Sequence, residues 1–299
     1  MKRTHIKPTE LRYSSDVEKH HLPTTHWISA FCILISALTL PSFGQSIQFD
    51  ASSPSTLTTN GNAITAWAAV KGGVTLMPIH GASNGWSTAT LHSVSGRSTV
   101  SFTSQDGISV PSPLAFHGTE TTQSVSAVFA IVRSQTPTPY MTLLDAPIDI
   151  RLESSMGYAF PFAGEGVPEG RGSGFSFQTE QLGNTATYAV NGKNTSIFLP
   201  SEGWQAVEVT FQTPVALDSL FVGGSVPSPT WNRGWDGEIA EIIFLPSDPT
   251  PEQRNALRHY ARVKWRVAVD CDASHTSDAI VREIGVNPGN AFTTFLFVR

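Results

Sequence analysis

The chain has 299 residues, of which 40% are hydrophobic and only 14% are charged, and it contains 24 glycines and 20 prolines. Few charges combined with many turn-forming residues favour an all-β protein over a helical one, and the apolar content excludes a disordered chain. The formal net charge of −5 is unsuited to binding the phosphate backbone of a nucleic acid.

The first 44 residues have the layout of a secretory signal peptide with an extended n-region. The uncharged apolar run Trp27–Leu40 follows a segment that holds five lysines and arginines, and Ser42 and Gly44 are small enough to precede a cleavage site. The run is shorter than the roughly 20 residues of a membrane span, and an uncleaved anchor is the alternative. We expect an extracellular or cell-surface protein, with the periplasm also open, and no stable membrane span after cleavage.

Cleavage of this segment would remove Cys32 and leave Cys271 as the one cysteine. An intramolecular disulfide and a cysteine-based zinc site are then both excluded.

Short strand-like runs separated by turn signals follow along the chain. Within one of them Val207, Val209 and Phe211 alternate with polar or small residues, which is typical of a strand with one buried face. The Asn191-Gly192 pair predicts a type I′ hairpin over Tyr188–Lys193. The predicted strands are Ser98–Thr103, Ser126–Arg133, Gly174–Thr179, Thr185–Val190, Gln205–Phe211, Asp218–Val222 and Glu238–Leu245.

A helix is predicted over about 251–264. Thr250 can cap it, Pro251 suits its first position, and Gln253 can complete a capping box. Leu257 and Tyr260 then face the sheet. The arginines at 254, 258 and 262 lie four residues apart, and we interpret them as a solvated outer face rather than an anion-binding surface.

The last segment, 269–299, differs from the rest. It begins with a polar linker, continues with a short predicted helix over Ser277–Ile284, and ends with the β-prone run Ala291–Val298. That run either adds an edge strand to the main sheet or forms a small appended β element.

Two segments together resemble the concanavalin A-like, laminin-G-like β-sandwich domains of bacterial secreted proteins. The first is Phe49–Leu57 with Ile64–Trp67 before Gly72-Gly73, and the second runs from Gly234–Phe244 to His259–Trp265. The resemblance covers about 47–267 and implies an antiparallel β-sandwich or jelly roll over 46–268 with one short C-terminal helix. It also implies that Trp235 and Trp265 are packing residues and that Glu241 is a structural acid.

The same fold hosts lectins and glycoside hydrolases, so the carboxylates decide between them. A catalytic pair on one strand needs acids on one face. Asp236 and Glu238 share a face, but Ala240 occupies the next position, and Glu241 points to the other side unless a bulge intervenes. We therefore assign no catalytic residues.

The best candidate binding residues lie just before this strand. Trp231 can receive the apolar face of a sugar, while Asn232, Arg233 and Asp236 can hydrogen-bond its hydroxyl groups. Trp86 is a second possible platform. Calcium is possible in such sandwiches, but the candidate ligands Asp50, Asp106, Asp145 and Asp149 are scattered, and no metal site is assigned.

The sequence thus predicts a secreted, non-catalytic, lectin-like module that binds a glycan or a cell-surface protein. The alternatives are a structural or adhesion component of a bacterial envelope assembly and a divergent glycoside hydrolase.

Overall fold

The computed structural model describes residues 44–78, 89–102, 116–119, 121–134, 142–145, 150–154, 175–178, 186–198, 201–217, 220–224, 235–272 and 278–289. Every described residue belongs to one compact unit, Phe43–Arg299. The predicted apolar run Trp27–Leu40 and the predicted β run Ala291–Val298 lie outside the described residues.

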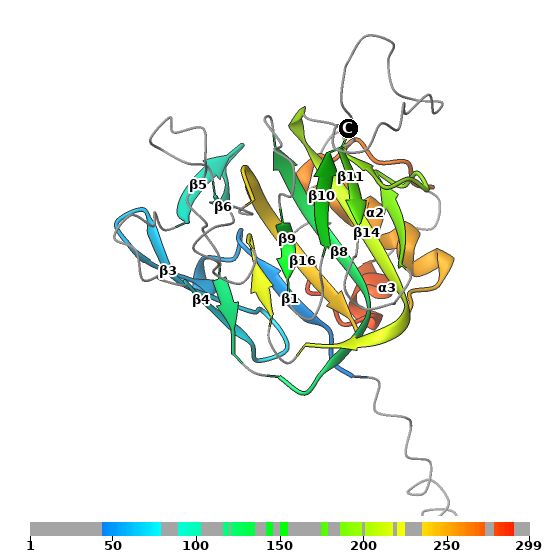
Figure 1. Ribbon diagram of the computed structural model, residues 1–299, viewed down its shortest axis with the longest axis horizontal. Helices are drawn as coiled ribbons and strands as arrows, with labels where there is room; N and C mark the ends of the chain where they lie inside the picture. Colours follow the sequence, from blue (N-terminus) through cyan, green and yellow to red (C-terminus); the bar gives the residue numbers. More distant parts are fainter. Residues whose placement is uncertain are drawn as a thin grey trace, which may run out of the picture. The chain divides into compact units, whose positions relative to one another are not determined.

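Antiparallel strands make up most of the described structure, which confirms the all-β class (Figure 1). Each of the seven predicted strands overlaps an observed one. The strands are β1 (Ile47–Asp50), β2 (Leu57–Asn60), β3 (Ala63–Ala68), β4 (Thr75–Pro78), β5 (Thr90–Val94), β6 (Arg97–Ser101), β7 (Phe116–Gly118), β8 (Ser124–Ser134), β9 (Thr142–Asp145), β10 (Ile150–Ser154), β11 (Phe175–Gln178), β12 (Ala186–Val190), β13 (Ile197–Phe198), β14 (Ser201–Ala216), β15 (Phe221–Val222) and β16 (Glu238–Leu245).

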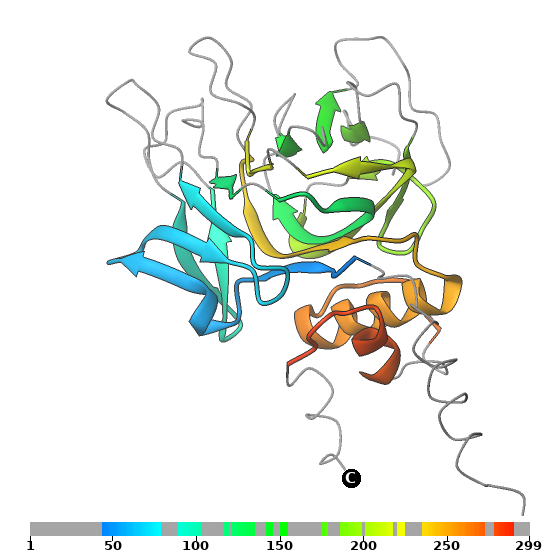
Figure 2. The same cartoon turned by 90° about the horizontal axis from the view of Figure 1, so that it is seen from below.

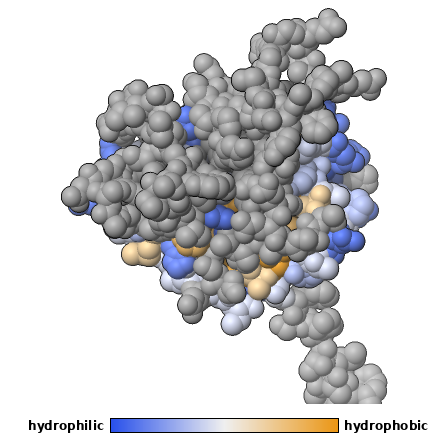
Figure 3. Space-filling model, in the orientation of Figure 1, coloured by the Kyte–Doolittle hydropathy of each residue, from blue (hydrophilic) through white to orange (hydrophobic). Residues whose placement is uncertain are grey.

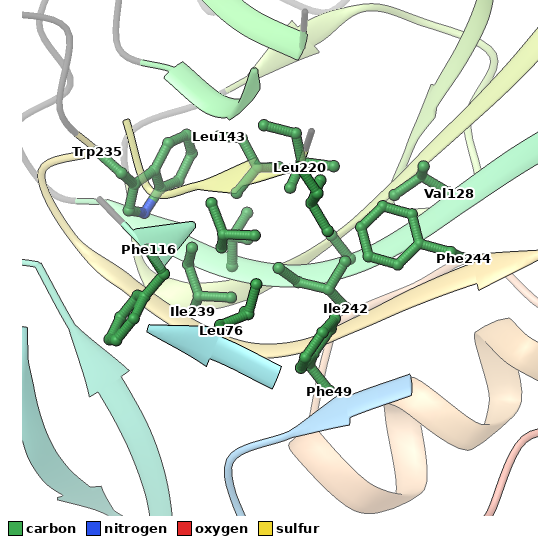
Figure 4. Packing of buried hydrophobic residues seen from close by; sticks show 14 of the residues in the cluster. Phe49, Leu76, Phe116, Val128, Leu143, Leu220, Trp235, Ile239, Ile242 and Phe244 are labelled. Carbon is green, nitrogen blue, oxygen red and sulfur yellow. The ribbon is translucent and has the colours of Figure 1, made fainter. Parts of the chain in front are cut away.

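The strands form one hydrogen-bonded sheet that curls back on itself. Their order is β12-β14-β8-β16-β6-β5-β3-β4-β7-β15-β9-β10-β11-β13, with β1 paired to β16 and β2 paired to β3. One apolar cluster takes side chains both from β8 and β16 and from β9 and β15, which lie far along this order. The two parts of the sheet therefore face each other across a common core. Figure 4 shows Leu143 and Leu220 packed over Ile239 and Ile242.

The central strand β8 is buried on both faces. Val128, Ala130 and Val132 point into the core between the two parts of the sheet, whereas Phe129 and Ile131 point to the opposite face. The continuous apolar run in this strand reflects its double burial, since neither face meets water.

Two helices cover that opposite face (Figure 2). The helix α2 (Pro251–Trp265) starts with the predicted capping box, in which Gln253 N–H donates to the Thr250 hydroxyl and Thr250 N–H donates to the Gln253 side chain. Leu257 and Tyr260 are buried against the sheet, as predicted. The short helix α3 (Asp278–Glu283) overlaps the predicted Ser277–Ile284 and packs on α2. No helix among the described residues is long and apolar enough to cross a membrane.

The predicted hairpin at Asn191-Gly192 forms its turn, but its second arm does not continue as a strand. Both residues have positive φ, 53° and 81°, as a type I′ turn requires. Only the pair Val190 and Lys193 is bridged across the turn. β12 pairs instead along β14, and the Asn191 carbonyl accepts a hydrogen bond from Asp270 N–H at 2.9 Å. The turn thus ties the sheet to the segment after α2.

The prediction that the helix arginines form a solvated outer face is wrong for two of the three. The Arg258 guanidinium makes two hydrogen bonds, of 2.6 and 2.9 Å, to Glu208, whose side chain is only 4% exposed. Arg254 contacts Asp248 and Thr210, while Arg262 is exposed as predicted. Glu208 lies on the helix-facing side of β14, so an acid on the sheet draws Arg258 inward.

Candidate functional site

The predicted ligand loop is only partly described. Trp231, Asn232, Arg233 and the second platform Trp86 lie outside the described residues. Asp236 is half-buried and lies two residues before β16. Its neighbour Trp235 is fully buried and packs edge-on against Phe198, with ring centroids 5.9 Å apart. Trp235 is therefore a packing residue, as predicted.

A bulge in β16 changes which acids share a face. In the pairing of β16 with β8, Ile239 lies opposite Val132 and Glu241 opposite Ile131, so Ala240 is the additional residue. Ile131 points to the helix-covered face. The bulge consequently turns Glu241 to the same face, whereas a regular strand would have turned it into the core.

Glu241 is the centre of a buried polar network between the sheet and α2. Its carboxylate is 0% exposed and accepts hydrogen bonds from Tyr260 Oη at 2.7 Å, Trp265 Nε1 at 2.7 Å and Lys264 Nζ at 3.0 Å. It also accepts one from Gln48 Nε2 at 2.6 Å. Three donors thus come from the last turns of one helix, at spacings of four and one residues.

The network extends to the start and the end of the described chain. Lys264 Nζ also donates to Asp50 Oδ2 at 2.7 Å and to the Tyr260 hydroxyl at 2.7 Å. The Gln48 side chain accepts from Asn287 N–H at 2.7 Å and donates to the Asn287 carbonyl at 3.1 Å. The opening strand, the closing strand, the helix and the tail are therefore joined through a single carboxylate.

Burial governs the electrostatics of this network. Desolvation raises the pKa of Glu241, and the Lys264 ammonium is the largest influence that opposes the rise. Burial also raises the pKa of Tyr260 well above its usual value, so its phenol remains a proton donor. A carboxylate that already receives a hydrogen bond on every side, away from solvent, has no position left for a substrate.

Glu238, the other acid of β16 on this face, is also engaged. Its carboxylate accepts from Arg133 Nε at 2.6 Å and contacts His92 Nδ1. The Glu238 side chain is 7% exposed, whereas His92 is 54% exposed. Glu238 therefore orients two basic side chains at the beginning of β16.

An open pocket lies beside these two acids, and we call it the tryptophan–arginine pocket. Its volume is about 520 Å³, and it lies between the β5–β6 turn, the beginning of β14 and the end of α2. The rings of Trp204 and Trp265 are 5.8 Å apart, at an angle of 53°. It is lined by Val94, Ser95, Gly96, Arg97, Arg133, Gly203, Trp204, Lys264, Trp265 and Arg266.

Each tryptophan in this pocket has a cation above its ring. The Arg133 guanidinium carbon is 5.0 Å from the Trp204 ring centroid, and that of Arg97 is 5.9 Å from the Trp265 ring centroid. Trp265 is almost fully buried, so its ring supports the pocket, whereas Trp204 is half-buried and keeps part of its surface open. Apolar ring surface and guanidinium donors are thus offered side by side.

Two further pockets offer fewer polar groups that a ligand could bind. One of about 590 Å³ lies between β12, β14 and α2, where Arg254 and Arg258 both contact Glu208. Another, of about 460 Å³, lies between Gly44–Ser46 and Glu283–Gly285 and is lined by residues without unusual functional groups. The face shown in Figure 3 mixes hydrophilic and apolar residues, and Met77 is the one large exposed hydrophobic side chain among the described residues.

The described residues show no cluster of acidic side chains of the kind that binds calcium. Within the described ranges no three His, Cys, Asp or Glu side chains gather closely enough to hold a metal ion. Of the four aspartates considered as ligands, Asp50 is bound to Lys264 and Ser52. Asp106 and Asp149 lie outside the described residues, and Asp145 is half-buried in β9.

Sequence reasoning missed the tryptophan–arginine pocket because its residues come from segments far apart in the chain. Arg97, Arg133 and Trp204 belong to different strands, and no spacing in the sequence links them to Trp265. The one available signal was Ser95-Gly96, a turn of two residues with positive φ that places Arg97 at the start of β6. Comparisons with protein-family models, with curated proteins and with solved structures found no match.

Proposed function

We propose that this chain is a secreted, non-catalytic β-sandwich module of the concanavalin A-like, jelly-roll type, and that it binds carbohydrate. The curled antiparallel sheet with one covered face is compatible with that fold. The closing segment that carries the resemblance, from Glu241 to Tyr260, Lys264 and Trp265, forms one continuous hydrogen-bonded network. The network explains why the closing segment has Glu241, Tyr260, Lys264 and Trp265 at these positions, and it supports the proposed fold type.

The observation that carries the binding proposal is the tryptophan–arginine pocket. Sugars present apolar C–H faces and rims of polar oxygens, and protein sites answer them with aromatic rings beside hydrogen-bond donors. Trp204 supplies accessible ring surface, and Arg97, Arg133 and Arg266 supply donors around it. A volume of about 520 Å³ lies within the range of small-molecule sites.

A glycan array probed with the purified chain tests the proposal, and two tryptophan variants locate the site. We expect Trp204→Ala to weaken binding about five- to thirtyfold, the loss of one aromatic contact, in protein whose circular dichroism shows that it is still folded. Trp231→Ala tests the sequence-predicted loop in the same way. Retained binding in Trp204→Ala with loss in Trp231→Ala would move the site to that loop, and no binding to any glycan would refute the proposal.

A glycoside hydrolase is the second candidate, and the β16 bulge is the observation in its favour. The bulge puts Glu238 and Glu241 on one face. However, Glu241 is fully buried and Glu238 is held by two basic side chains, so neither is placed to protonate a glycosidic oxygen. We expect no release of reducing sugar from polysaccharides. Hydrolysis that is abolished by Glu238→Gln would establish the hydrolase instead.

A further inference from the structure

The lining of the tryptophan–arginine pocket is strongly positive in a chain that is negative overall. Among the described residues its charged lining consists of Arg97, Arg133, Lys264 and Arg266, with no acid. The whole chain carries a formal charge of −5. In a chain with more acids than bases, a pocket lined at random would include acidic side chains. The cationic lining therefore indicates a specific role for the pocket.

Two of the four cations are matched by acids behind the pocket wall. Lys264 is bound to Asp50 and Glu241, which are at most 10% exposed, and Arg133 is bound to Glu238. Arg97 and Arg266 have no carboxylate within salt-bridge distance among the described residues. These two guanidinium groups therefore leave an uncompensated charge facing the pocket.

Contacts with the protein hold the side chains of Arg97 and Arg133 in place, and a backbone conformation positions Arg266. Arg97 follows the tight Ser95-Gly96 turn and lies over the Trp265 ring. Arg133 lies between the Trp204 ring and Glu238. Arg266 is the residue that ends α2, in the left-handed conformation with φ of 58°. The Arg97 and Arg133 side chains therefore lose little conformational freedom on binding, which favours affinity.

We propose that the tryptophan–arginine pocket binds an acidic sugar unit, whose carboxylate or sulfate is held by Arg97 and Arg266 while its ring lies against Trp204. The inference rests on the proposed carbohydrate-binding function and names the class of glycan. Guanidinium groups bind carboxylates and sulfates through paired hydrogen bonds, and both anions are therefore within the proposal.

A nucleic acid would suit this pocket less well than an acidic glycan. Binding to a polyphosphate chain draws on many cationic contacts along the strand. Here two arginines that have no carboxylate partner among the described residues face a single pocket, which offers few contacts to a strand. One anionic group beside an aromatic surface fits the arrangement better.

Isothermal titration calorimetry of the full chain tests the inference. The probes are polygalacturonate for carboxylate, dextran sulfate for sulfate, neutral dextran, and a single-stranded oligodeoxynucleotide. We expect at least one acidic polysaccharide to bind at least tenfold more tightly than dextran and the oligonucleotide, and the affinity to fall when salt is raised from 50 to 500 mM. The preferred acidic probe then identifies which of the two anions is recognised.

Charge-neutral variants assign the binding to the pocket. Arg97→Gln and Arg266→Gln should each weaken binding of the preferred acidic polysaccharide about tenfold or more, with unchanged melting temperatures. Arg262→Gln is the matched control, because Arg262 is an exposed arginine of the same helix that does not line the pocket. Its affinity should equal that of the wild type.

The outcomes separate this inference from the proposed function. Binding only to neutral glycans, lost in Trp204→Ala and unchanged in Arg97→Gln, would overturn the acidic class and leave carbohydrate binding in place. Equal losses in Arg262→Gln and Arg97→Gln would indicate diffuse attraction and overturn the pocket. Tighter binding of the oligonucleotide, lost in Arg97→Gln, would overturn the glycan assignment. No binding to any glycan would overturn both.

Discussion

Replacing Lys264 by methionine tests whether the buried network holds the helix on the sheet. Methionine keeps most of the aliphatic length of lysine and removes the charge. In the native protein the Lys264 ammonium lies 2.7 Å from Asp50 Oδ2 and 3.0 Å from Glu241 Oε2, and the side chain is 4% exposed. The substitution therefore leaves two buried carboxylates close to each other without their shared cation.

The expected cost follows from that geometry. Removing one partner of a buried ion pair typically costs about 3–5 kcal/mol, because the remaining charge is buried without compensation. The free energy of unfolding of most domains is about 5–15 kcal/mol, so this variant should lose a large fraction of it. Urea titration followed by circular dichroism measures the difference. Lys193→Met, at an exposed position, is the control and should cost under about 0.5 kcal/mol.

The loss should also depend on pH, with a definite sign. Burial already raises the pKa of Glu241, and Lys264 is the main influence that lowers it. Without Lys264 the pKa in the folded protein rises further. A group with a raised folded-state pKa contributes stability that is present below its unfolded-state pKa and is lost as the pH rises through the folded-state value. Lys264→Met should therefore be more destabilising at pH 8 than at pH 5.

A double variant checks that the acid is the origin of the effect. Adding Glu241→Gln to Lys264→Met removes the uncompensated charge, so the double variant should be less destabilised than the sum of the two single ones, and its pH dependence should decrease. A cost for Lys264→Met below about 1 kcal/mol, or one that is equal at pH 5 and pH 8, would refute the reasoning.

Three further predictions concern the helix, a turn and export. Arg258→Ala should cost about 2–4 kcal/mol because it strands the buried Glu208, whereas Arg262→Ala should cost under about 0.5 kcal/mol; equal midpoints in denaturant would contradict the pairing. Gly192→Ala should cost about 2 kcal/mol or more, since φ is 81° and the new Cβ would lie 2.3 Å from the Asp270 carbonyl oxygen; at Gly61, with φ of 60° and open space, the same change should cost only about 1 kcal/mol in thermal melts. The exported protein should begin at or near Gln45, and N-terminal sequencing that finds residues 1–40 in secreted material would disprove the signal peptide.

Arg258 lies against the sheet although the helical spacing of the arginines predicts a solvated position for it. The spacing of the three helix arginines is compatible with a single exposed stripe, and an isolated amphipathic helix would leave them in water. A buried acid on the neighbouring strand reverses that preference for Arg258. The sequence contains Glu208 in an alternating strand, but it does not say which helix residue will lie opposite it.

The bulge at Ala240 is a similar case. An alternating strand predicts that Glu241 points away from Glu238, and one additional residue in β16 turns Glu241 toward α2. This orientation of the Glu241 side chain is favourable because Tyr260, Lys264 and Trp265 supply hydrogen-bond donors on the α2 side of the sheet. A carboxylate in the apolar core would have had no partners.

What the sequence by itself determined is local in origin. The capping box at Thr250 and Gln253, the positive φ at Asn191-Gly192 and the doubly apolar strand Ala127–Val132 depend on residues a few positions apart, whose preferences act before any distant contact forms. The tertiary structure alone decided the partners of Glu241 and Arg258 and the assembly of Arg97, Arg133, Trp204 and Trp265 into one pocket. Those arrangements depend on contacts between segments that lie up to 214 residues apart in the chain, and such contacts follow from how the sheet curls and how α2 docks on it.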